Sequence, residues 1–196
     1  MDHKNGCDHQ HCTGAHGNTS VCQTLSEMDW ERGLWYAAFN GDKNRVRMLI
    51  DKAKNVREAV NAPDNSGYTP LHYSARKGYE DICNTLLQNG AQVNATTKSG
   101  KATPLHKAAA AGQIGTVKLL IKSGASVDFQ DIDGQTALHK AVQYKHFDLI
   151  NILVEACPEL SSIKDIKGRI ATDHIQCSDH YSLIRKLTLK LLLYLF

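Results

Sequence analysis

A tetrapeptide recurs along this chain at a spacing that restricts the fold more than any other feature. The segment 69–72, Thr-Pro-Leu-His, returns unchanged at 103–106 and as Thr-Ala-Leu-His at 136–139, at intervals of 34 and 33 residues. Each copy follows a glycine and precedes an apolar stripe with helical spacing. A repeat of this length predicts a solenoid, in which each unit buries its apolar face against its neighbours.

The residue types of the motif indicate how each helix begins and ends. Thr69 can accept hydrogen bonds from free N–H groups at a helix start, and Pro70 in the first turn loses no helical hydrogen bond. Gly78 and Gly112 stand where the chain would reverse, at positions where a positive φ is costly for other residues. Each unit is therefore expected to contain two helices joined by a turn.

The motif, its period and the surrounding glycines resemble the ankyrin repeat, which has about 33 residues and the pattern Thr-Pro-Leu-His-x-Ala. The resemblance implies an all-α solenoid of about five helix-turn-helix repeats with β-hairpin tips. Degenerate copies flank the three clear ones and would serve as caps. The expected division is a flexible leader at 1–27 and a repeat domain at 28–196, with units at 28–62, 63–96, 97–129, 130–163 and 164–196.

Length, charge and hydropathy argue against several classes of function. The 196 residues suit one domain, and 42% hydrophobic residues suffice for a core. A net charge of +3, from 23 basic and 20 acidic residues, is too small and too evenly mixed for a nucleic-acid partner. The amino terminus lacks the apolar run of a secretory signal. We therefore expect an intracellular protein, cytoplasmic and/or nuclear.

The carboxyl-terminal segment departs from the repeat pattern. Leucines occupy more than one helical face between Leu183 and Phe196, whereas a capping helix should present a polar outer side. The stretch 187–196 is too short to span a membrane. We expect no membrane span, but an exposed apolar patch that could support self-association or contact with a membrane surface.

The chain contains ten histidines and six cysteines, which raises the question of catalysis. His72, His106 and His139 recur once per unit, where an imidazole would hydrogen-bond between neighbouring turns rather than join a catalytic triad. Cys83 lies in an apolar helical stripe and is expected in the core. The sequence contains no phosphate-binding glycine loop, nucleophile elbow or zinc-protease helix motif. We predict no enzyme activity and no catalytic residue.

The leader carries a cluster of cysteine and histidine side chains, which are the ligands that Zn²⁺ prefers in tetrahedral sites. Their spacing matches no standard zinc module, and the glycines between them favour a flexible chain. Two interpretations stay open: a zinc-binding adaptor, with zinc as the only cofactor, or a disordered tail that attracts metal nonspecifically. The candidate ligands are Cys7, His9, Cys12, His16 and Cys22.

A modification site is implied by the resemblance. Asn94 closes the segment Gly-Ala-Gln-Val-Asn at 90–94, a position similar to the asparagines that are hydroxylated in some ankyrin proteins. Hydroxylation of Asn94 is therefore a hypothesis, which the mass of the corresponding peptide would test.

Stacked units without catalytic chemistry offer mainly their variable surface side chains for function. The resemblance places these on a concave face, formed by the hairpin tips and the inner helices. We predict a non-enzymatic protein-protein interaction scaffold or adaptor, in which aromatic residues anchor the partner protein and basic residues favour an acidic edge. The predicted partner-binding residues are Phe39, Asn40, Asn65, Ser66, Tyr68, Arg76, Lys77, Lys98, Lys101, Ile132, Asp133, Gln135, Gln143 and Tyr144.

Overall fold

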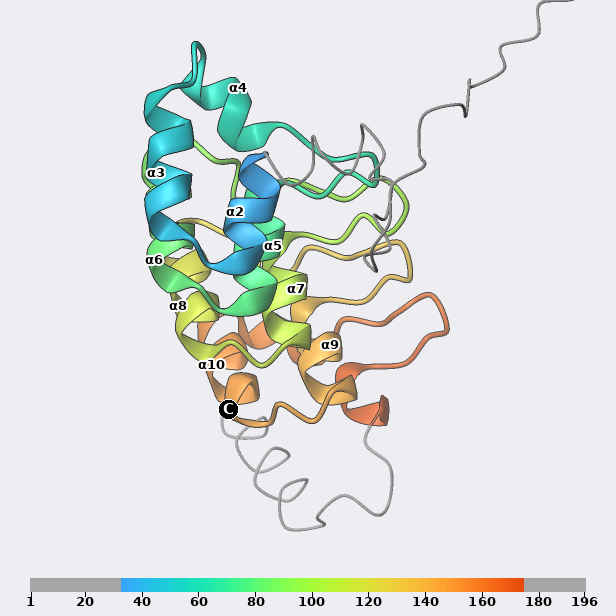
Figure 1. The fold of residues 1–196 in the computed structure, drawn as a ribbon. Helices are drawn as coiled ribbons and strands as arrows, with labels where there is room; N and C mark the ends of the chain where they lie inside the picture. The colour runs from blue at the N-terminus through green and yellow to red at the C-terminus, as the bar shows by residue number, and fades with distance from the viewer. Residues whose placement is uncertain (1–32, 175–196) are drawn as a thin grey trace, which may run out of the picture.

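The computed structural model describes residues 33–174, and its helices are stacked in successive pairs (Figure 1). The described residues contain no strand, so this part of the chain is all-α, as predicted. The α-helices are α2 (Leu34–Asn40), α3 (Lys43–Asp51), α4 (Val56–Asn61), α5 (Pro70–Lys77), α6 (Glu80–Gln88), α7 (Pro104–Ala110), α8 (Ile114–Lys122), α9 (Ala137–Gln143) and α10 (Asp148–Ala156). Two short 3-10 helices follow, η1 (Pro158–Ser161) and η2 (Ala171–His174).

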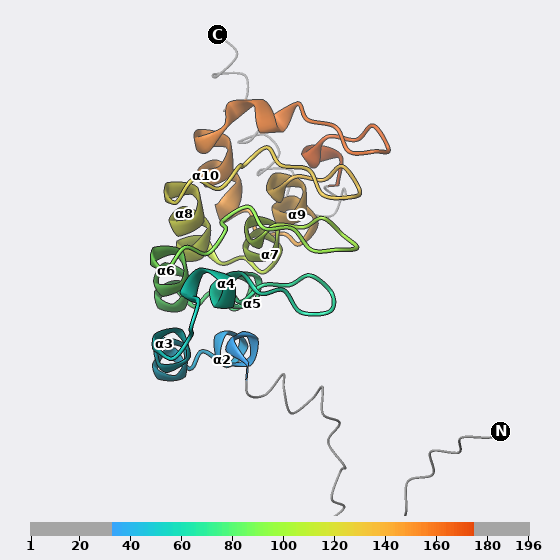
Figure 2. The same cartoon turned by 90° about the horizontal axis from the view of Figure 1, so that it is seen from above.

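The helix pairs form two layers (Figure 2). The inner layer contains α2, α5, α7 and α9, each packed against the next, and η2 continues this row after α9. The outer layer contains α3, α6, α8 and α10. Turns that lead into the inner helices project away from both layers, and we call them tips: 64–68, 97–102, 131–135 and 165–169. The tips and the inner helices together form the tip face.

The repeated motif starts the inner helices as predicted. Thr69 precedes α5 with an extended backbone, at φ −89° and ψ 165°, and Pro70 occupies the first turn. The helix ends at Gly78, whose φ of 80° is reached by glycine without steric cost. In the next unit the Thr103 hydroxyl accepts the N–H of His106 at 3.5 Å. Local chemistry therefore sets where these short helices begin and end.

The core is a column of side chains between the layers. Leu71 and Leu105 of the inner layer and Leu86 and Leu120 of the outer layer are at most 1% exposed. Cys83 is fully buried among them, as predicted. Because each unit contributes the same kinds of side chain, burial depends on the neighbouring units as well as on the unit itself.

The first unit contains an additional short helix, α4. Asn55 precedes it, and its side chain accepts the N–H of Glu58 at 3.2 Å. Val60 of α4 is fully buried. The indole N–H of Trp35 donates to the carbonyl of Ala62 at 2.7 Å and so connects α2 to the end of α4. This insertion is therefore part of the packed structure.

The predicted β-hairpin form of the tips is not confirmed. Within the described residues the tips are hydrogen-bonded turns: the N–H of Asp64 donates to the Tyr68 carbonyl, and that of Gly67 to the Asp64 carbonyl, both at 2.9 Å. The number of repeats is not confirmed either, because residues 33–174 contain four helix pairs and only η2 of a further unit.

Two predicted features lie outside the described residues: the leader at 1–27 and the apolar segment 187–196. The boundaries of the predicted units stay predictions. Between residues 33 and 174, no helix combines the length and the apolar character that crossing a membrane requires.

Candidate interaction surface

An aspartate at the first position holds three of the four described tips. The Oδ1 atom of Asp64 accepts the N–H groups of Ser66 and Tyr68, at 2.9 and 2.8 Å. Asp131 and Asp165 accept the equivalent pairs of N–H groups, all at 2.9 Å. A carboxylate that accepts two backbone N–H groups satisfies the donors of the turn and fixes its conformation.

Backbone hydrogen bonds also connect each tip to the next. Three N–H groups donate to carbonyl oxygens of the preceding tip, all at 3.0 Å: Lys98 to Ser66, Ile132 to Gly100 and Ile166 to Asp133. The four tips therefore form a continuous ribbon along one side of the solenoid (Figure 1). A surface built on this ribbon is ordered before a partner arrives.

The tip at 97–102 differs from the other three. Thr97 stands where they have an aspartate, and its hydroxyl accepts the N–H of Ala102 at 3.0 Å. The tip has one residue more, which accounts for the interval of 34 residues between Thr69 and Thr103. Lys101 accommodates the added residue with a φ of 48°, in the left-handed region that non-glycine residues rarely adopt.

The repeated histidines link neighbouring units, as predicted. Their Nδ1 atoms each face the backbone N–H of the preceding threonine, at 3.1 to 3.2 Å. The other ring nitrogen, Nε2, faces a carbonyl oxygen of the next unit. Because a carbonyl only accepts and a backbone N–H only donates, each ring is neutral with its proton on Nε2. The Nε2 atoms of His72, His106 and His139 lie 3.0, 3.0 and 3.3 Å from the carbonyl oxygens of Ala102, Gln135 and Arg169.

Burial keeps these imidazoles neutral. It lowers the pKa of His72 from 6.5 to about 4, although the Ala102 carbonyl acts in the opposite direction. Burial is also the main cause that lowers the pKa values of His106 and His139. With both nitrogens engaged by backbone groups, these rings are structural, and they have no free nitrogen for base catalysis or metal binding.

An aromatic–cation strip crosses three consecutive units on the tip face. It consists of Phe39 on α2, Tyr68 on the first tip, Tyr73 and Lys77 on α5, and Lys107 on α7. The Lys77 Nζ atom lies 4.3 Å from the centre of the Phe39 ring, and Lys107 Nζ 4.8 Å from that of Tyr68. The Tyr73 ring lies between the other two, 6.0 Å from Phe39 and 5.4 Å from Tyr68. The contacts are of favourable kinds and hold the lysines against the rings.

Hydrogen bonds fix the strip to the first tip. The Tyr73 hydroxyl donates to Oδ2 of Asp64 at 2.6 Å, and the Lys107 ammonium donates to the Tyr68 hydroxyl at 2.8 Å. Burial and the neighbouring Asp64 carboxylate raise the pKa of Tyr73 above its ordinary value, so its hydroxyl stays protonated. The rings of Phe39, Tyr68 and Tyr73 are each partly exposed, which leaves apolar surface available to a partner.

Two hollows lie on the tip face beside the strip, and Lys107 of the strip lines the smaller one. Their volumes are about 350 and 220 Å³, and Asp133, Lys140 and Tyr144 line both. Large apolar side chains stand at their edges, with Ile132 54%, Tyr144 55% and Ile166 68% exposed. Exposed apolar groups around a polar depression are typical of interaction surfaces.

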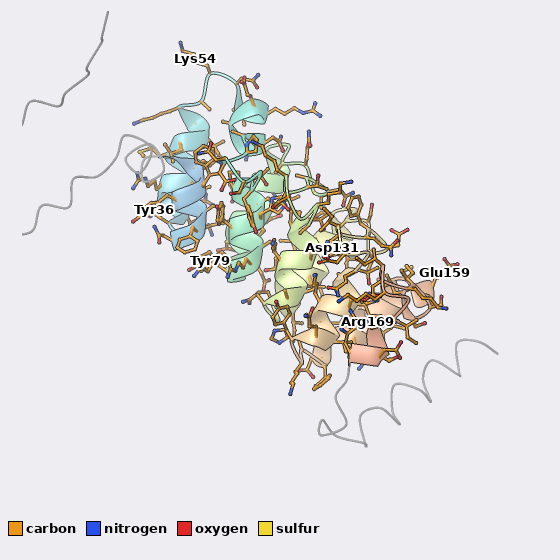
Figure 3. All side chains as sticks on the ribbon, turned by 90° about the vertical axis from the view of Figure 1, so that its right-hand side faces the viewer. Tyr36, Lys54, Tyr79, Asp131, Glu159 and Arg169 are labelled. Atoms are coloured by element: carbon orange, nitrogen blue, oxygen red, sulfur yellow. The ribbon has the colours of Figure 1, made fainter. Side chains whose placement is uncertain are left out.

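The charged groups inside the hollows are mostly paired. The Lys140 ammonium lies 2.7 Å from Asp131 and donates to the Gln135 side chain at 2.6 Å. The Arg169 guanidinium lies 2.7 Å from Asp165. Burial opposes ionisation of Asp165, but the N–H and the guanidinium of Arg169 outweigh it and lower its pKa. Figure 3 views the molecule from the side of the tips and labels Asp131 and Arg169.

The structure places most predicted partner-binding residues on the tip face with accessible side chains. Phe39 and Tyr68 are partly exposed. Gln135 requires a correction: it is only 6% exposed, because its side chain turns toward Lys140, so it is not available to a partner. The exposed members of the set are Asn40, Asn65, Ser66, Arg76, Lys77, Lys98, Lys101, Ile132, Asp133, Gln143 and Tyr144.

Three residues of this surface were not predicted from the sequence. Tyr73, Lys107 and Lys140 share one position, directly after the repeated histidine. The sequence signal that could have found them is a large polar side chain at this position in every unit, between the repeated histidine and a small residue.

The metal prediction falls on another part of the chain. The candidate zinc ligands Cys7, His9, Cys12, His16 and Cys22 lie outside the described residues, so zinc binding stays a prediction. From residue 33 to 174, no group of three or more His, Cys, Asp or Glu side chains is arranged to hold a metal ion.

Asn94 connects two units through its side chain. Its amide donates to the Ser126 hydroxyl at 3.1 Å, and its Oδ1 atom accepts the Ser126 N–H at 2.9 Å. Hydroxylation of Asn94 stays a prediction, and a hydroxylase would have to reach a partly buried, hydrogen-bonded side chain.

We expect Cys83 to resist alkylation in the folded protein. Burial raises the pKa of its thiol to about 11, and its Sγ atom lies 3.2 Å from the Ser74 hydroxyl. With iodoacetamide near neutral pH, its labelling should be roughly 100-fold slower than in urea, because only a thiolate reached through unfolding reacts. Mass mapping of the Cys83 peptide would measure this, with the partly exposed Cys157 as internal reference. Equal labelling of both cysteines in the folded protein would contradict the prediction.

Comparison with known proteins agrees with this architecture. A family model described as ankyrin repeats in three copies matches residues 9–97 and 96–164. The chain is 46% identical over 86 residues to Homo sapiens Ankyrin repeat domain-containing protein 39, covering 44% of the chain and 45% of that protein. The Bos taurus protein of that name is 48% identical over 68 residues, 35% of each chain.

A longer relative shares the repeats alone. Homo sapiens Ankyrin repeat and SAM domain-containing protein 1A is 47% identical over 98 residues, which are 49% of this chain but 9% of that protein. The matches thus span less than half the length of each of these three relatives. Since the family model matches most of the sequence and the structure shows stacked helix pairs, the chain belongs to the ankyrin-repeat family.

Proposed function

We propose that this protein is a non-enzymatic scaffold or adaptor whose tip face holds a partner protein. The observation that carries the proposal is the aromatic–cation strip, which joins three consecutive units through ring and cation contacts. Aromatic side chains such as these are enriched at the energetic centres of protein interfaces. The strip contains three of the predicted residues, Phe39, Tyr68 and Lys77.

The rigidity of the tip face supports this proposal. Three of its tips are fixed internally by aspartates and the fourth by Thr97. Backbone hydrogen bonds join the tips, and Lys107 is already hydrogen-bonded to Tyr68. Binding then requires little ordering of loops or side chains, which is one of the main costs of association. A partner that bridges several units would also gain from their fixed relative positions.

The chemistry of the described residues favours binding over catalysis. The repeated histidines are neutral and engaged with backbone groups, and the Cys83 thiol is buried with a raised pKa. These groups suit packing between units rather than proton transfer to a substrate. We further propose a cytoplasmic and/or nuclear location and a protein rather than a nucleic-acid partner, since the net charge is only +3.

The test is proximity labelling in cells with the wild type and two double variants. Tyr68→Ala with Tyr144→Ala removes partly exposed and exposed aromatic rings from the tip face. Met48→Ala with Ile114→Ala removes apolar side chains that are 44% and 38% exposed on the outer layer. We expect specific partners to be lost only with the tip-face variant.

Folding of both double variants is checked by circular dichroism and urea unfolding. If both variants label the same specific partners as the wild type, the tip face is not the binding surface. If only the outer-layer variant loses partners, the interface lies on α3 and α8 instead.

A further inference from the structure

The tip face concentrates positive charge in two neighbouring units. Their tips and inner helices, residues 63–77 and 97–110, contain five cations and one carboxylate. The equivalent segment of the next unit, 130–144, contains one cation and two carboxylates. Because the whole chain carries only +3, this excess is a local property of the surface. The five cations are Arg76, Lys77, Lys98, Lys101 and Lys107.

The single carboxylate in these segments is already engaged. Asp64 accepts two N–H groups on Oδ1, from Ser66 and Tyr68, and the Tyr73 hydroxyl on Oδ2. Its charge is therefore used to hold its own tip and the Tyr73 ring. It is not placed in an ion pair with any of the five lysine and arginine side chains.

Lys107 differs from the lysine at the equivalent position of the next unit. Lys140 lies 2.7 Å from Asp131, the first residue of its own tip. In the unit of Lys107 that position is Thr97, and the tip 97–102 contains no acidic residue. Lys107 turns instead toward the preceding tip, where its ammonium contacts the ring and the hydroxyl of Tyr68. Neither of these groups is a carboxylate.

The environment of Lys107 makes it a fitting partner for a carboxylate. The residue is partly buried, and its ammonium contacts the Tyr68 ring and hydroxyl without an anion among the described residues. An ammonium that is bonded to one hydroxyl keeps further N–H donors for a charge-assisted hydrogen bond to a carboxylate. The Tyr68 ring holds the ammonium in place, which lowers the ordering cost of that contact.

The longer tip adds further cations next to this group. Lys98 and Lys101 are both exposed on tip 97–102. The backbone bond from Lys98 to Ser66 fixes this tip against the tip that carries Tyr68. The lysine site, defined as Tyr68, Lys98, Lys101 and Lys107, thus combines one cation held by an aromatic ring with two exposed cations beside it.

We infer that the lysine site binds an acidic segment of a partner protein, with an aspartate or glutamate carboxylate on Lys107 Nζ. Lys98 and Lys101 attract the neighbouring acidic residues, and the Tyr68 ring contacts an apolar group of the same segment. The inference rests on the proposed function and specifies the chemistry of the partner. It assigns the central contact to Lys107, which the repeat motif alone does not single out.

The test uses the full chain and a phage-displayed library of random dodecapeptides. We expect peptides selected on the wild type to be enriched in Asp and Glu over the unselected library. Selected peptides are then synthesised together with versions in which single acidic residues become Asn or Gln. Their affinities are measured for the wild type, Lys107→Met and Lys118→Met. Lys118→Met is the control, because Lys118 is an exposed lysine of the outer helix α8 and its replacement changes the charge by the same amount.

We expect Lys107→Met to weaken binding about tenfold and Lys118→Met to leave it unchanged. Neutralising one acidic residue of the peptide should lower its affinity for the wild type but not for Lys107→Met, because the change in the peptide and the change in the protein remove the same contact. Urea unfolding of each variant verifies that the fold is retained.

The other outcomes separate this inference from the proposed function. If the selected peptides are not enriched in acidic residues but lose binding with Tyr68→Ala, the carboxylate site is wrong. The tip face then remains the binding surface. Equal losses for the Lys107 and Lys118 variants would show general attraction and overturn the site. Peptides that bind the Tyr68→Ala, Tyr144→Ala double variant as tightly as the wild type would contradict both the lysine site and the proposed function. Displacement of the peptides by a short RNA, dependent on Lys107, would favour a polyanion instead.

Discussion

Lowering the pH from 7 to 4.5 is expected to reduce the free energy of unfolding by more than about 2 kcal/mol from His72 alone. The pKa of this buried side chain is about 4 in the folded protein, against 6.5 for the ordinary group. The unfolded chain therefore binds more protons between these values, so stability is complete above pH 6.5 and falls as the pH decreases toward 4. His106 and His139 have pKa values shifted in the same direction and add to the loss.

The main physical cause is burial, which disfavours the charged imidazole. A proton added to Nδ1 of His72 would face the N–H of Thr69, which can only donate. Lys107 also disfavours the charged ring, whereas Asp64 and the carbonyls of Ala95 and Ala102 favour it. Carboxylates such as Asp165, whose pKa is lowered, lose their contribution at more acidic pH than this window.

Urea unfolding at several pH values between 7 and 4 measures this effect. The matched variant is His72→Gln, whose amide replaces the imidazole with a group that does not titrate. Its stability should depend less steeply on pH, by up to about 1.4 kcal/mol for each pH unit, since one proton fewer is taken up on unfolding. An identical slope for the variant and the wild type would show that His72 does not titrate in this window.

Replacing Gly67 by alanine should destabilise the protein by about 3 kcal/mol. Gly67 has a φ of 85°, and an added Cβ atom would lie 2.5 Å from the backbone nitrogen of Lys98. Relief of this overlap requires the two tips to separate, and that breaks the bond from the Lys98 N–H to the Ser66 carbonyl. The cost therefore includes both backbone strain and the loss of a connection between units.

Gly124→Ala is the matched control for this substitution. Gly124 has a φ of 87°, but nothing lies within 4 Å of an added Cβ atom. Its replacement should cost only the strain of the left-handed backbone, about 1 to 2 kcal/mol. Urea unfolding compares the two variants, and equal losses would mean that contact between the tips contributes nothing. Because the lysine site spans the same two tips, Gly67→Ala should also weaken the binding of acidic peptides, whereas Gly124→Ala should not.

The helical repeat could be predicted from the sequence because its signals are local. Thr69, Pro70 and Gly78 define the start and end of a helix by their own chemistry, and the period places Leu105 where Leu71 packs. The short helix α4 also had a local signal, Asn55 three residues before Glu58, but it lies outside the repeat period.

The interaction surface was less predictable because it depends on contacts between units. Gln135 lies on a tip, yet Lys140 of the following helix draws its side chain inward. The partner of Lys107 is Tyr68, which is 39 residues away in the sequence. The position of a residue within its repeat indicates whether its side chain is exposed. Pairings such as that of Lys107 with Tyr68 join side chains of two units, so predicting them requires the packed structure.

The tip at 97–102 shows how this architecture tolerates changes in length. It contains an additional residue, and the left-handed backbone at Lys101 absorbs it before α7 begins at Pro104. The histidine bridges on either side keep similar lengths, 3.0 Å to Ala102 and 3.0 Å to Gln135. The additional residue therefore does not propagate into the stack, and the length of this tip can differ from that of its neighbours while the bonds from Lys98 to Ser66 and from Ile132 to Gly100 still join the tips.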